Sequence, residues 1–180
     1  MQGNTTAQLR GSWRNFSKYR PLIRELVTRD LKVKYRRSFL GYVWSILNPL
    51  LMMLLQTLVF SYMFRFQIEN FPLYLICGNT LFNFFNESTN MGMGSVLGNS
   101  SLIKKVYVPK FIFPISRVVS SFVNLLFSLA AILLVMLITR SPFHLTILLV
   151  WAPLVLLFLF TCGMALLLSA LAVYFRDLQY

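Results

Sequence analysis

Residues Gly98 to Pro114, GNSSLIKKVYVPKFIFP, form a short basic segment between two long apolar runs. The chain has 180 residues, of which 57% are hydrophobic and 12% are charged, whereas about a quarter of the residues of a soluble domain are charged. Apolar runs of this length indicate a protein that crosses the membrane several times. The basic segment then lies outside the membrane, where another protein can bind it.

Basic residues are distributed unevenly along the chain. Ten of the 17 Lys and Arg residues lie between Arg10 and Arg37. Cytoplasmic retention and anionic lipid headgroups explain a basic block beside apolar runs. Because no aromatic platform or zinc-ligand spacing accompanies the charge, we do not expect nucleic acid as a partner. Cys77 and Cys162 lie inside apolar runs, without a CxxC or a nearby His, so they indicate neither a metal site nor a redox motif.

The polar N-terminal part of the chain divides into two segments. Residues 1–18 are expected to form a flexible cytoplasmic arm. In residues 19–40, apolar side chains recur at helical spacing from Leu22 to Leu31, with basic residues mostly on the other side. This pattern predicts an amphipathic helix in the membrane interface, and a solvated cytoplasmic helix is the alternative. Asp30 falls within the apolar stripe, where Lys34, four residues on, is its expected partner.

Residues 41–180 are predicted to form an all-α transmembrane domain with four spans, at about 41–64, 72–97, 113–138 and 145–172. A helix of this length, at about 1.5 Å per residue, crosses a hydrocarbon core of about 30 Å. Pro49 leaves two possibilities for the first span. It either kinks the helix, or it begins the helix after a cap at Asn48. Pro153 predicts a kink in the fourth span.

The positions of Lys and Arg predict the orientation of the spans. A cytoplasmic N-terminus places the ten N-terminal basic residues and three lysines of the loop 98–112 on the inner side. Only Arg65 and Arg140 are left for the outer loops. We therefore expect both the N-terminus and the loop 98–112 to lie in the cytoplasm.

The second predicted span is unusually polar. Its asparagines are spaced by four, three and four residues, which places them on one side of a helix next to Glu87: Asn79, Asn83, Asn86 and Asn90. Two interpretations stay open. The stripe either forms hydrogen bonds that join helices, or it lines a hydrated translocation path. Glu87 slightly favours the path, because ionisable residues near the middle of the membrane are candidates for functional sites.

Enzymatic motifs are missing from the sequence. It contains no GxxxxGK[ST] phosphate loop, no nucleophile elbow and no HExxH. The five acidic residues are scattered, which argues against a membrane enzyme that transfers sugars or phosphates. We expect no catalytic residue, no metal and no cofactor in this chain, and we expect a partner to supply the energy for any transport.

Three stretches together resemble one family: FLGYVWSILNPLL at 39–51, GNSSLIKKVYVPKFIFP at 98–114 and VYFRD at 173–177. They are similar to the permease subunits of type-2 ABC exporters, in the branch that exports polysaccharides and teichoic acids. The similarity covers about Ser17 to Tyr180. It implies a multi-pass permease homodimer in the bacterial cytoplasmic membrane, paired with two separate ATPase subunits that hold ATP and magnesium.

The resemblance also implies two groups of site residues. The loop 98–112 would carry a coupling helix that docks on the ATPase through Leu102, Lys104, Lys105, Tyr107 and Lys110. For Lys104 and Lys105, retention on the inner side alone is the alternative. The amphipathic helix would be a gate-like helix at the entrance for the lipid-linked substrate. Its basic residues would suit the diphosphate or lipid headgroups: Arg24, Arg29, Lys32, Lys34, Arg36 and Arg37.

The resemblance implies a permease subunit that moves a polyprenyl-diphosphate-linked polysaccharide or teichoic acid outward. The family has six spans and only four are predicted in this chain, so we expect a fragment or a truncated form. An exporter of a small drug or lipid is one alternative function. A membrane scaffold without a transport role is another.

Overall fold

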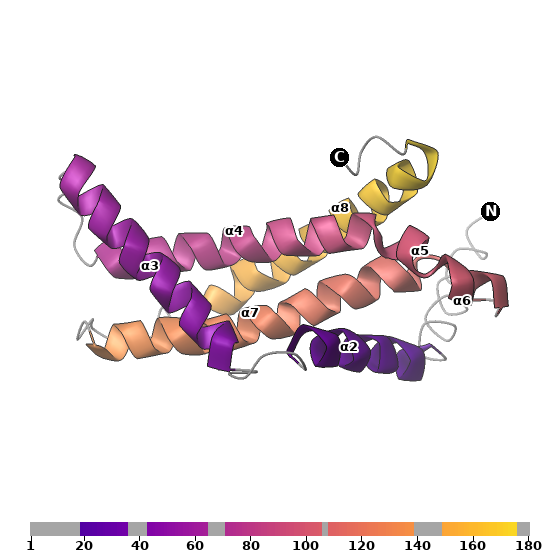
Figure 1. The fold of residues 1–180 in the computed structure, drawn as a ribbon, viewed down its shortest axis with the longest axis horizontal. Coiled ribbons are helices and arrows are strands. Elements are labelled where there is room, and N and C mark those ends of the chain that lie inside the picture. The colour runs from indigo at the N-terminus through magenta and orange to yellow at the C-terminus, as the bar shows by residue number, and fades with distance from the viewer. Residues whose placement is uncertain (1–18, 36–42, 65–70, 106–107, 139–148, 176–180) are drawn as a thin grey trace, which may run out of the picture.

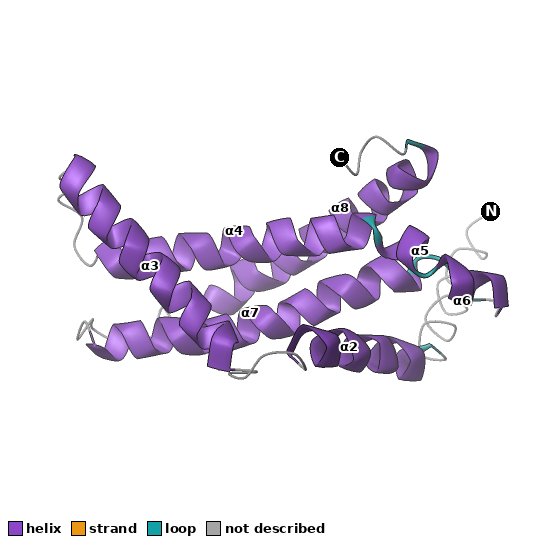
Figure 2. Ribbon diagram, in the orientation of Figure 1, coloured by secondary structure: helices purple, strands orange, loops and turns teal. Residues whose placement is uncertain are grey.

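The structure is a computed structural model that describes residues 19–35, 43–64, 71–105, 108–138 and 149–175. This part of the chain is helical and contains no strand (Figure 1; Figure 2), which confirms the all-α prediction. Its long helices are α2 Arg20–Tyr35, α3 Val43–Phe64, α4 Phe71–Met93, α7 Ile112–Ile138 and α8 Trp151–Tyr174. Two short helices, α5 Ser95–Gly98 and α6 Ser100–Lys105, lie between α4 and α7.

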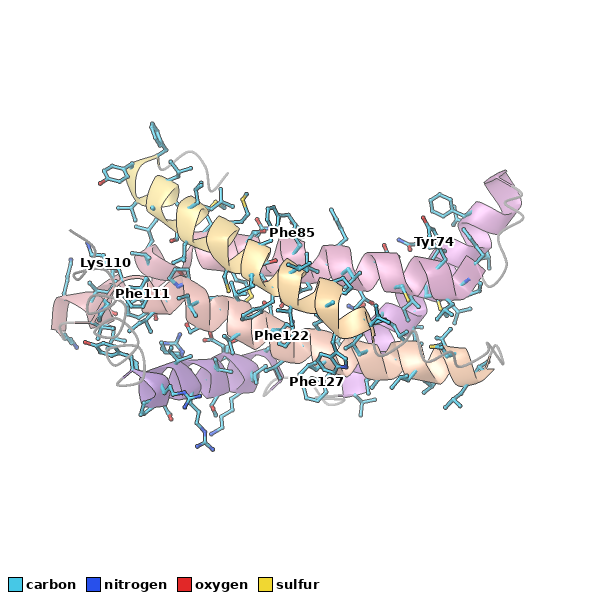
Figure 3. The ribbon with its side chains drawn as sticks, turned by 180° about the vertical axis from the view of Figure 1, so that it is seen from behind. Tyr74, Phe85, Lys110, Phe111, Phe122 and Phe127 are labelled. Atoms are coloured by element: carbon cyan, nitrogen blue, oxygen red, sulfur yellow. The ribbon has the colours of Figure 1, made fainter. Side chains whose placement is uncertain are left out.

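Helices α4, α7 and α8 pack together and form the body of the molecule (Figure 1). Phe122 of α7 lies between two other rings, with centroids 5.8 Å from Phe84 of α4 and 5.0 Å from Phe158 of α8 (Figure 3). Close approach of α4 and α8 depends on Gly92. A Cβ atom at this position would lie 2.7 Å from the Cβ atom of Ala165, which is too short for a non-bonded carbon contact.

Two described helices are long and apolar enough to cross a membrane. They are α7, with 27 residues, and α8, with 24 residues, and both reach a mean hydropathy of 2.6 over an 18-residue window. Only 28% and 22% of these windows are buried inside the protein. Apolar side chains that point outward in such numbers need lipid around them. The chain is therefore a membrane protein.

Helix α3 crosses α4 and α7 at the end of the bundle that is far from α6 (Figure 1). Pro49 lies inside α3, so the alternative in which the helix starts at Pro49 is wrong. Pro72, Pro114 and Pro153 each lie in the first turn of their helices, where a missing N–H leaves no intrahelical hydrogen bond unmade. The kink predicted at Pro153 is therefore wrong, because this proline is too close to the helix start.

Helix α4 ends at Met93, and Gly94 separates it from α5. The second span was predicted to continue to residue 97. Glycines are poor helix formers, and Gly92 and Gly94 both lie where the long helix ends. The chain then changes direction through α5 and α6 before it enters α7 (Figure 1).

Helix α2 lies beside the first half of α7 (Figure 1). Its apolar stripe packs into a cluster built on Leu26, Ile112 and Phe113, with Leu102 and Ile103 of α6 against it. The amphipathic pattern predicted a helix in the membrane interface, and that location stays a prediction. In the structure the apolar stripe contacts α6 and α7, because both present apolar side chains to it.

Candidate functional site

A buried carboxylate joins α2 to α7. The Asp30 side chain is only 5% exposed, and its oxygens lie 3.0 Å from Arg29 Nη2 and 3.0 Å from Arg117 Nη1. A buried carboxylate needs such partners, because a buried charge without a counter-ion is strongly destabilising. The predicted pairing of Asp30 with Lys34 is wrong. The stripe that contains Asp30 faces α7, and therefore Asp30 meets Arg117.

The same cluster extends to the segment between α5 and α6. Arg29 Nη1 donates a hydrogen bond of 3.2 Å to Asn99 Oδ1. Asn99 in turn donates a hydrogen bond of 2.7 Å from Nδ2 to the carbonyl of Ser95. Since Asn99 directly precedes α6, Arg29 connects three elements: α2 itself, the start of α6 and, through Asp30, α7.

Lys34 contacts α4 instead of α7. Its Nζ atom lies 2.5 Å from Glu87 Oε1, and Asn124 Nδ2 of α7 lies 3.5 Å from the same oxygen. The side chains of Lys34 and Glu87 are 42% and 34% exposed. This ion pair is therefore far more open to its surroundings than the pairs of Asp30.

A crevice of about 480 Å³ lies between α2, α4 and α7. We call it the crevice, and its charged lining residues are Arg29, Asp30, Lys34, Glu87 and Arg117. Three of these are basic and two are acidic, which leaves one net positive charge. Such a lining suits an anionic group, because guanidinium and ammonium groups bind phosphate and carboxylate oxygens strongly.

A smaller hollow of about 70 Å³ lies between α3, α4 and α7, next to the crevice. We call it the inner hollow. Glu87 and Asn124 line both the crevice and the inner hollow, so these two side chains stand where the spaces meet. Thr80 Oγ1 is buried at the inner hollow and has no hydrogen-bond partner among the described residues. The hollow therefore suits a polar occupant and has room for water.

The predicted asparagine stripe splits into two parts. Asn79, Asn83 and Glu87 line the inner hollow, and Asn79 also donates a hydrogen bond to Gln56 of α3. Asn86 and Asn90 are both exposed, and Asn90 Nδ2 donates a hydrogen bond of 2.9 Å to Asn86 Oδ1. The hollow therefore borders the edge of the stripe that continues toward Glu87, and Asn86 and Asn90 lie on the other edge.

Sequence reasoning missed the second wall of the hollow. Helix α7 contributes Arg117, Ser121, Asn124 and Ser128 to the crevice and the inner hollow. Their spacing of four, three and four residues repeats the spacing of the asparagines on α4. This pattern is present in the sequence, but serines are common in apolar helices, so they do not by themselves indicate a polar wall. We call the two facing walls the polar seam: Asn79, Asn83 and Glu87 of α4 with Arg117, Ser121, Asn124 and Ser128 of α7.

The polar seam offers hydrogen bonds and charge, and it offers no reactive centre. Within the described residues, no group of three His, Cys, Asp or Glu side chains could hold a metal ion. Amide, hydroxyl and carboxylate groups can exchange hydrogen bonds with water or with sugar hydroxyls. The arrangement therefore fits the binding or passage of a polar molecule.

Comparison with known families identifies the fold. Residues 21–180 match the family described as ABC-2 type transporter. The chain belongs to this family. Among curated relatives of this ABC-2 transporter chain, the "O-antigen export system permease protein RfbA" of Myxococcus xanthus is 36% identical over 171 residues, which cover 93% of the chain and 64% of that protein.

Two further relatives also belong to polysaccharide transport systems by name. A Klebsiella pneumoniae protein, again named "O-antigen export system permease protein RfbA", is 32% identical over 86% of the chain and 60% of its own length. The "Polysialic acid transport protein KpsM" of Escherichia coli is 26% identical over 87% of the chain and 62% of its own length. The chain thus spans between 60% and 64% of the length of these curated relatives.

The predicted docking residues of this ABC-2 transporter chain differ in exposure. Lys104 and Lys105 are exposed at the end of α6. Lys110, which Figure 3 labels, is exposed just before α7. Leu102 is partly buried and packs into the cluster of α2 and α7. It therefore positions α6, whereas the lysines form an accessible surface. Tyr107 lies outside the described residues.

The predicted headgroup residues fall on two sides of α2. Arg29 and Lys34 line the crevice. Arg24 and Lys32 are exposed and do not line it. Arg36 and Arg37 lie outside the described residues. The structure therefore separates basic side chains that share the crevice with Arg117 from those that do not.

Proposed function

We propose that this chain is the permease subunit of an ATP-driven exporter that moves a lipid-linked polysaccharide outward across the bacterial cytoplasmic membrane. The observation that carries the proposal is the polar seam. It places hydrogen-bonding groups between α4 and α7, although α7 otherwise exposes apolar side chains. The names of the relatives, which refer to O-antigen and polysialic acid, support a sugar polymer as the cargo. A teichoic acid is the alternative polymer cargo.

In this proposal α3 and α4 cross the membrane together with α7 and α8. They have 22 and 23 residues, and at about 1.5 Å per residue each is long enough for a hydrocarbon core of about 30 Å. The N-terminus and α6 face the cytoplasm, in agreement with the excess of Lys and Arg on that side. The polar seam then leads from the cytoplasmic end toward the middle of the membrane.

A separate ATPase subunit is proposed to dock at α6. The printed sequence has no phosphate loop of its own, so ATP and magnesium belong to the partner. Lys104, Lys105 and Lys110 supply an exposed basic surface for acidic groups of that partner. By resemblance to the family, two copies of the permease form a homodimer. Nucleotide in the partner then changes which state of the permease is favoured.

The crevice is proposed to receive the diphosphate that joins the polymer to its polyprenyl lipid. Arg29, Lys34 and Arg117 are the basic residues that line it. Arg24 and Lys32 are exposed elsewhere on α2, where they suit anionic membrane lipids. This division assigns substrate and bulk lipid to different basic residues of the same helix.

Substitution of one asparagine at a time tests whether the polar seam is a path. Asn83→Leu should remove most of the export, because Asn83 lines the inner hollow. Asn86→Leu is the matched control, since Asn86 is an exposed asparagine of the same helix outside the hollow. Polysaccharide on the cell surface is measured in an export-deficient strain that expresses the chain with its ATPase. Equal export by both variants would contradict the proposal. Loss of assembled permease with Asn83→Leu would instead support helix joining.

A further inference from the structure

Helix α2 is attached much more firmly on one side than on the other. Toward α6 and α7 it contributes Leu26 to an apolar cluster and Asp30 to a buried ion network. Toward α4, α2 forms one ion pair among the described residues, between Lys34 and Glu87. A movement that separates α2 from α4 therefore has to break one exposed contact, whereas a movement away from α7 has to open a packed core.

The pair of Lys34 and Glu87 occupies the boundary between two spaces. Lys34 lines the crevice, and Glu87 lines both the crevice and the inner hollow. The two side chains are joined at 2.5 Å and bridge α2 and α4 at this boundary.

We propose that Lys34 and Glu87 form a latch that closes the polar seam, and that an anionic group of the substrate releases it by replacing Glu87 as the counter-ion of Lys34. Glu87 is thus a positioning residue, which holds Lys34 in place until a phosphate arrives. This inference rests on the proposed function, because it names the regulation of the same path. In addition to that function, it proposes that binding of the substrate itself opens the path.

The chemistry of the latch suits an exchange of partners. Both side chains are partly exposed to the crevice, so an anion can approach Lys34 without unfolding of α2. Glu87 keeps a neighbouring donor after release, since Asn124 Nδ2 lies 3.5 Å from its Oε1 atom. The anion binds the open state better than the closed state, because Glu87 occupies Lys34 in the closed state. This difference in affinity is what a ligand needs to shift a conformational equilibrium.

The network of Asp30 keeps α2 in place during this exchange. Arg29 and Arg117 stay bound to Asp30, and Arg29 stays bound to Asn99 at the start of α6. Release of Lys34 therefore frees the C-terminal end of α2 from α4, while the rest of the helix remains joined to α6. The entrance and the proposed ATPase-docking helix are mechanically connected through Arg29.

Accessibility of a cysteine in the inner hollow tests the latch. Ser128→Cys places a thiol in the hollow, in a chain whose free cysteines Cys77 and Cys162 are replaced by Ala. The permease and its ATPase are kept together in inside-out vesicles without ATP. The rate of reaction with a small water-soluble thiol reagent is then measured.

Glu87→Gln should raise the labelling rate by about fivefold, the population change expected when a partly exposed ion pair is lost. Glu25→Gln, which changes an exposed acid of α2, should leave the rate unchanged. Lys34→Glu should also raise the rate, and the double exchange of Lys34→Glu with Glu87→Lys should restore it. A rate that does not change with Glu87→Gln, or a double exchange that fails to restore it, would overturn the latch.

Inorganic diphosphate is the probe for release by an anion. It should raise the labelling rate of the parent protein and have no further effect on Glu87→Gln. No effect on either protein would overturn the release mechanism. Polysaccharide on the surface of the same strains reports on the proposed function separately. If Glu87→Gln loses export while its labelling rate stays at that of the parent protein, the result would contradict the latch but would not contradict the proposed export function.

Discussion

Helix α2 makes two sets of ionic contacts four residues apart, and they differ in burial. Asp30 is 5% exposed and binds two arginines, whereas the side chains of Lys34 and Glu87 are 42% and 34% exposed. In the first set, loss of one partner leaves a charge without compensation inside the protein. In the second set, water and ions replace the lost partner at little cost. The same type of interaction therefore fixes the helix at Asp30 and leaves its last turn, which carries Lys34, able to move.

Asp30→Asn should have the largest effect, because it breaks the buried set. The variant leaves Arg117 without its carboxylate, and we expect a loss of about 3 kcal/mol in the free energy of unfolding. The midpoint of thermal unfolding in detergent measures this loss, with Glu25→Gln as the control on the exposed face of α2. Equal midpoints for the two variants would remove the contrast between the buried and the exposed set of contacts.

Leu26→Ala should have an effect of comparable size, because it tests the apolar part of the firm attachment. Leu26 is 5% exposed in the cluster with Ile112 and Phe113, and a buried Leu→Ala change costs about 2–4 kcal/mol. Val33→Ala is the control, since Val33 is 70% exposed on the same helix. The same unfolding measurement applies. A loss as small as that of the control would mean that the cluster does not hold α2 on α7.

Glu87→Gln should have the smallest effect on stability. Removal of a partly exposed ion pair costs about 1 kcal/mol or less, so the unfolding midpoint should stay close to that of the parent protein. The same variant should change access to the inner hollow, as the latch requires. A large drop in the midpoint would show that the pair is structural, and that the two sets of contacts hold α2 equally firmly.

Several features of the fold were predictable because they depend on local pattern. Continuous apolar runs predicted the long helices, and α7 and α8 confirm this at membrane-spanning length. The stripe of Leu22 to Leu31 predicted an amphipathic helix, and α2 is one. The partner of that stripe was not predictable, because lipid and the apolar side chains of α6 and α7 satisfy the same pattern.

The candidate site was predictable in part. Periodicity identified Asn79, Asn83 and Glu87 as one polar face, and these residues line the inner hollow. It also included Asn86 and Asn90, which face away from the hollow. The sequence of one helix does not determine which neighbouring helix each of its faces contacts. The packing of α3 and α7 against α4 decides which part of the stripe borders the inner hollow.

The sequence by itself determined an all-helical membrane chain, a concentration of basic residues in its N-terminal part and a polar stripe on one helix. These properties follow from hydropathy, charge and helical period, which act over a few neighbouring residues. Only the tertiary structure decided that Asp30 binds Arg117 and that Lys34 binds Glu87. These partners lie 87 and 53 residues apart in the chain, and packing of α2 between α4 and α7 brings them together. Burial, which no local pattern contains, then makes the contact of Asp30 more costly to break than that of Lys34.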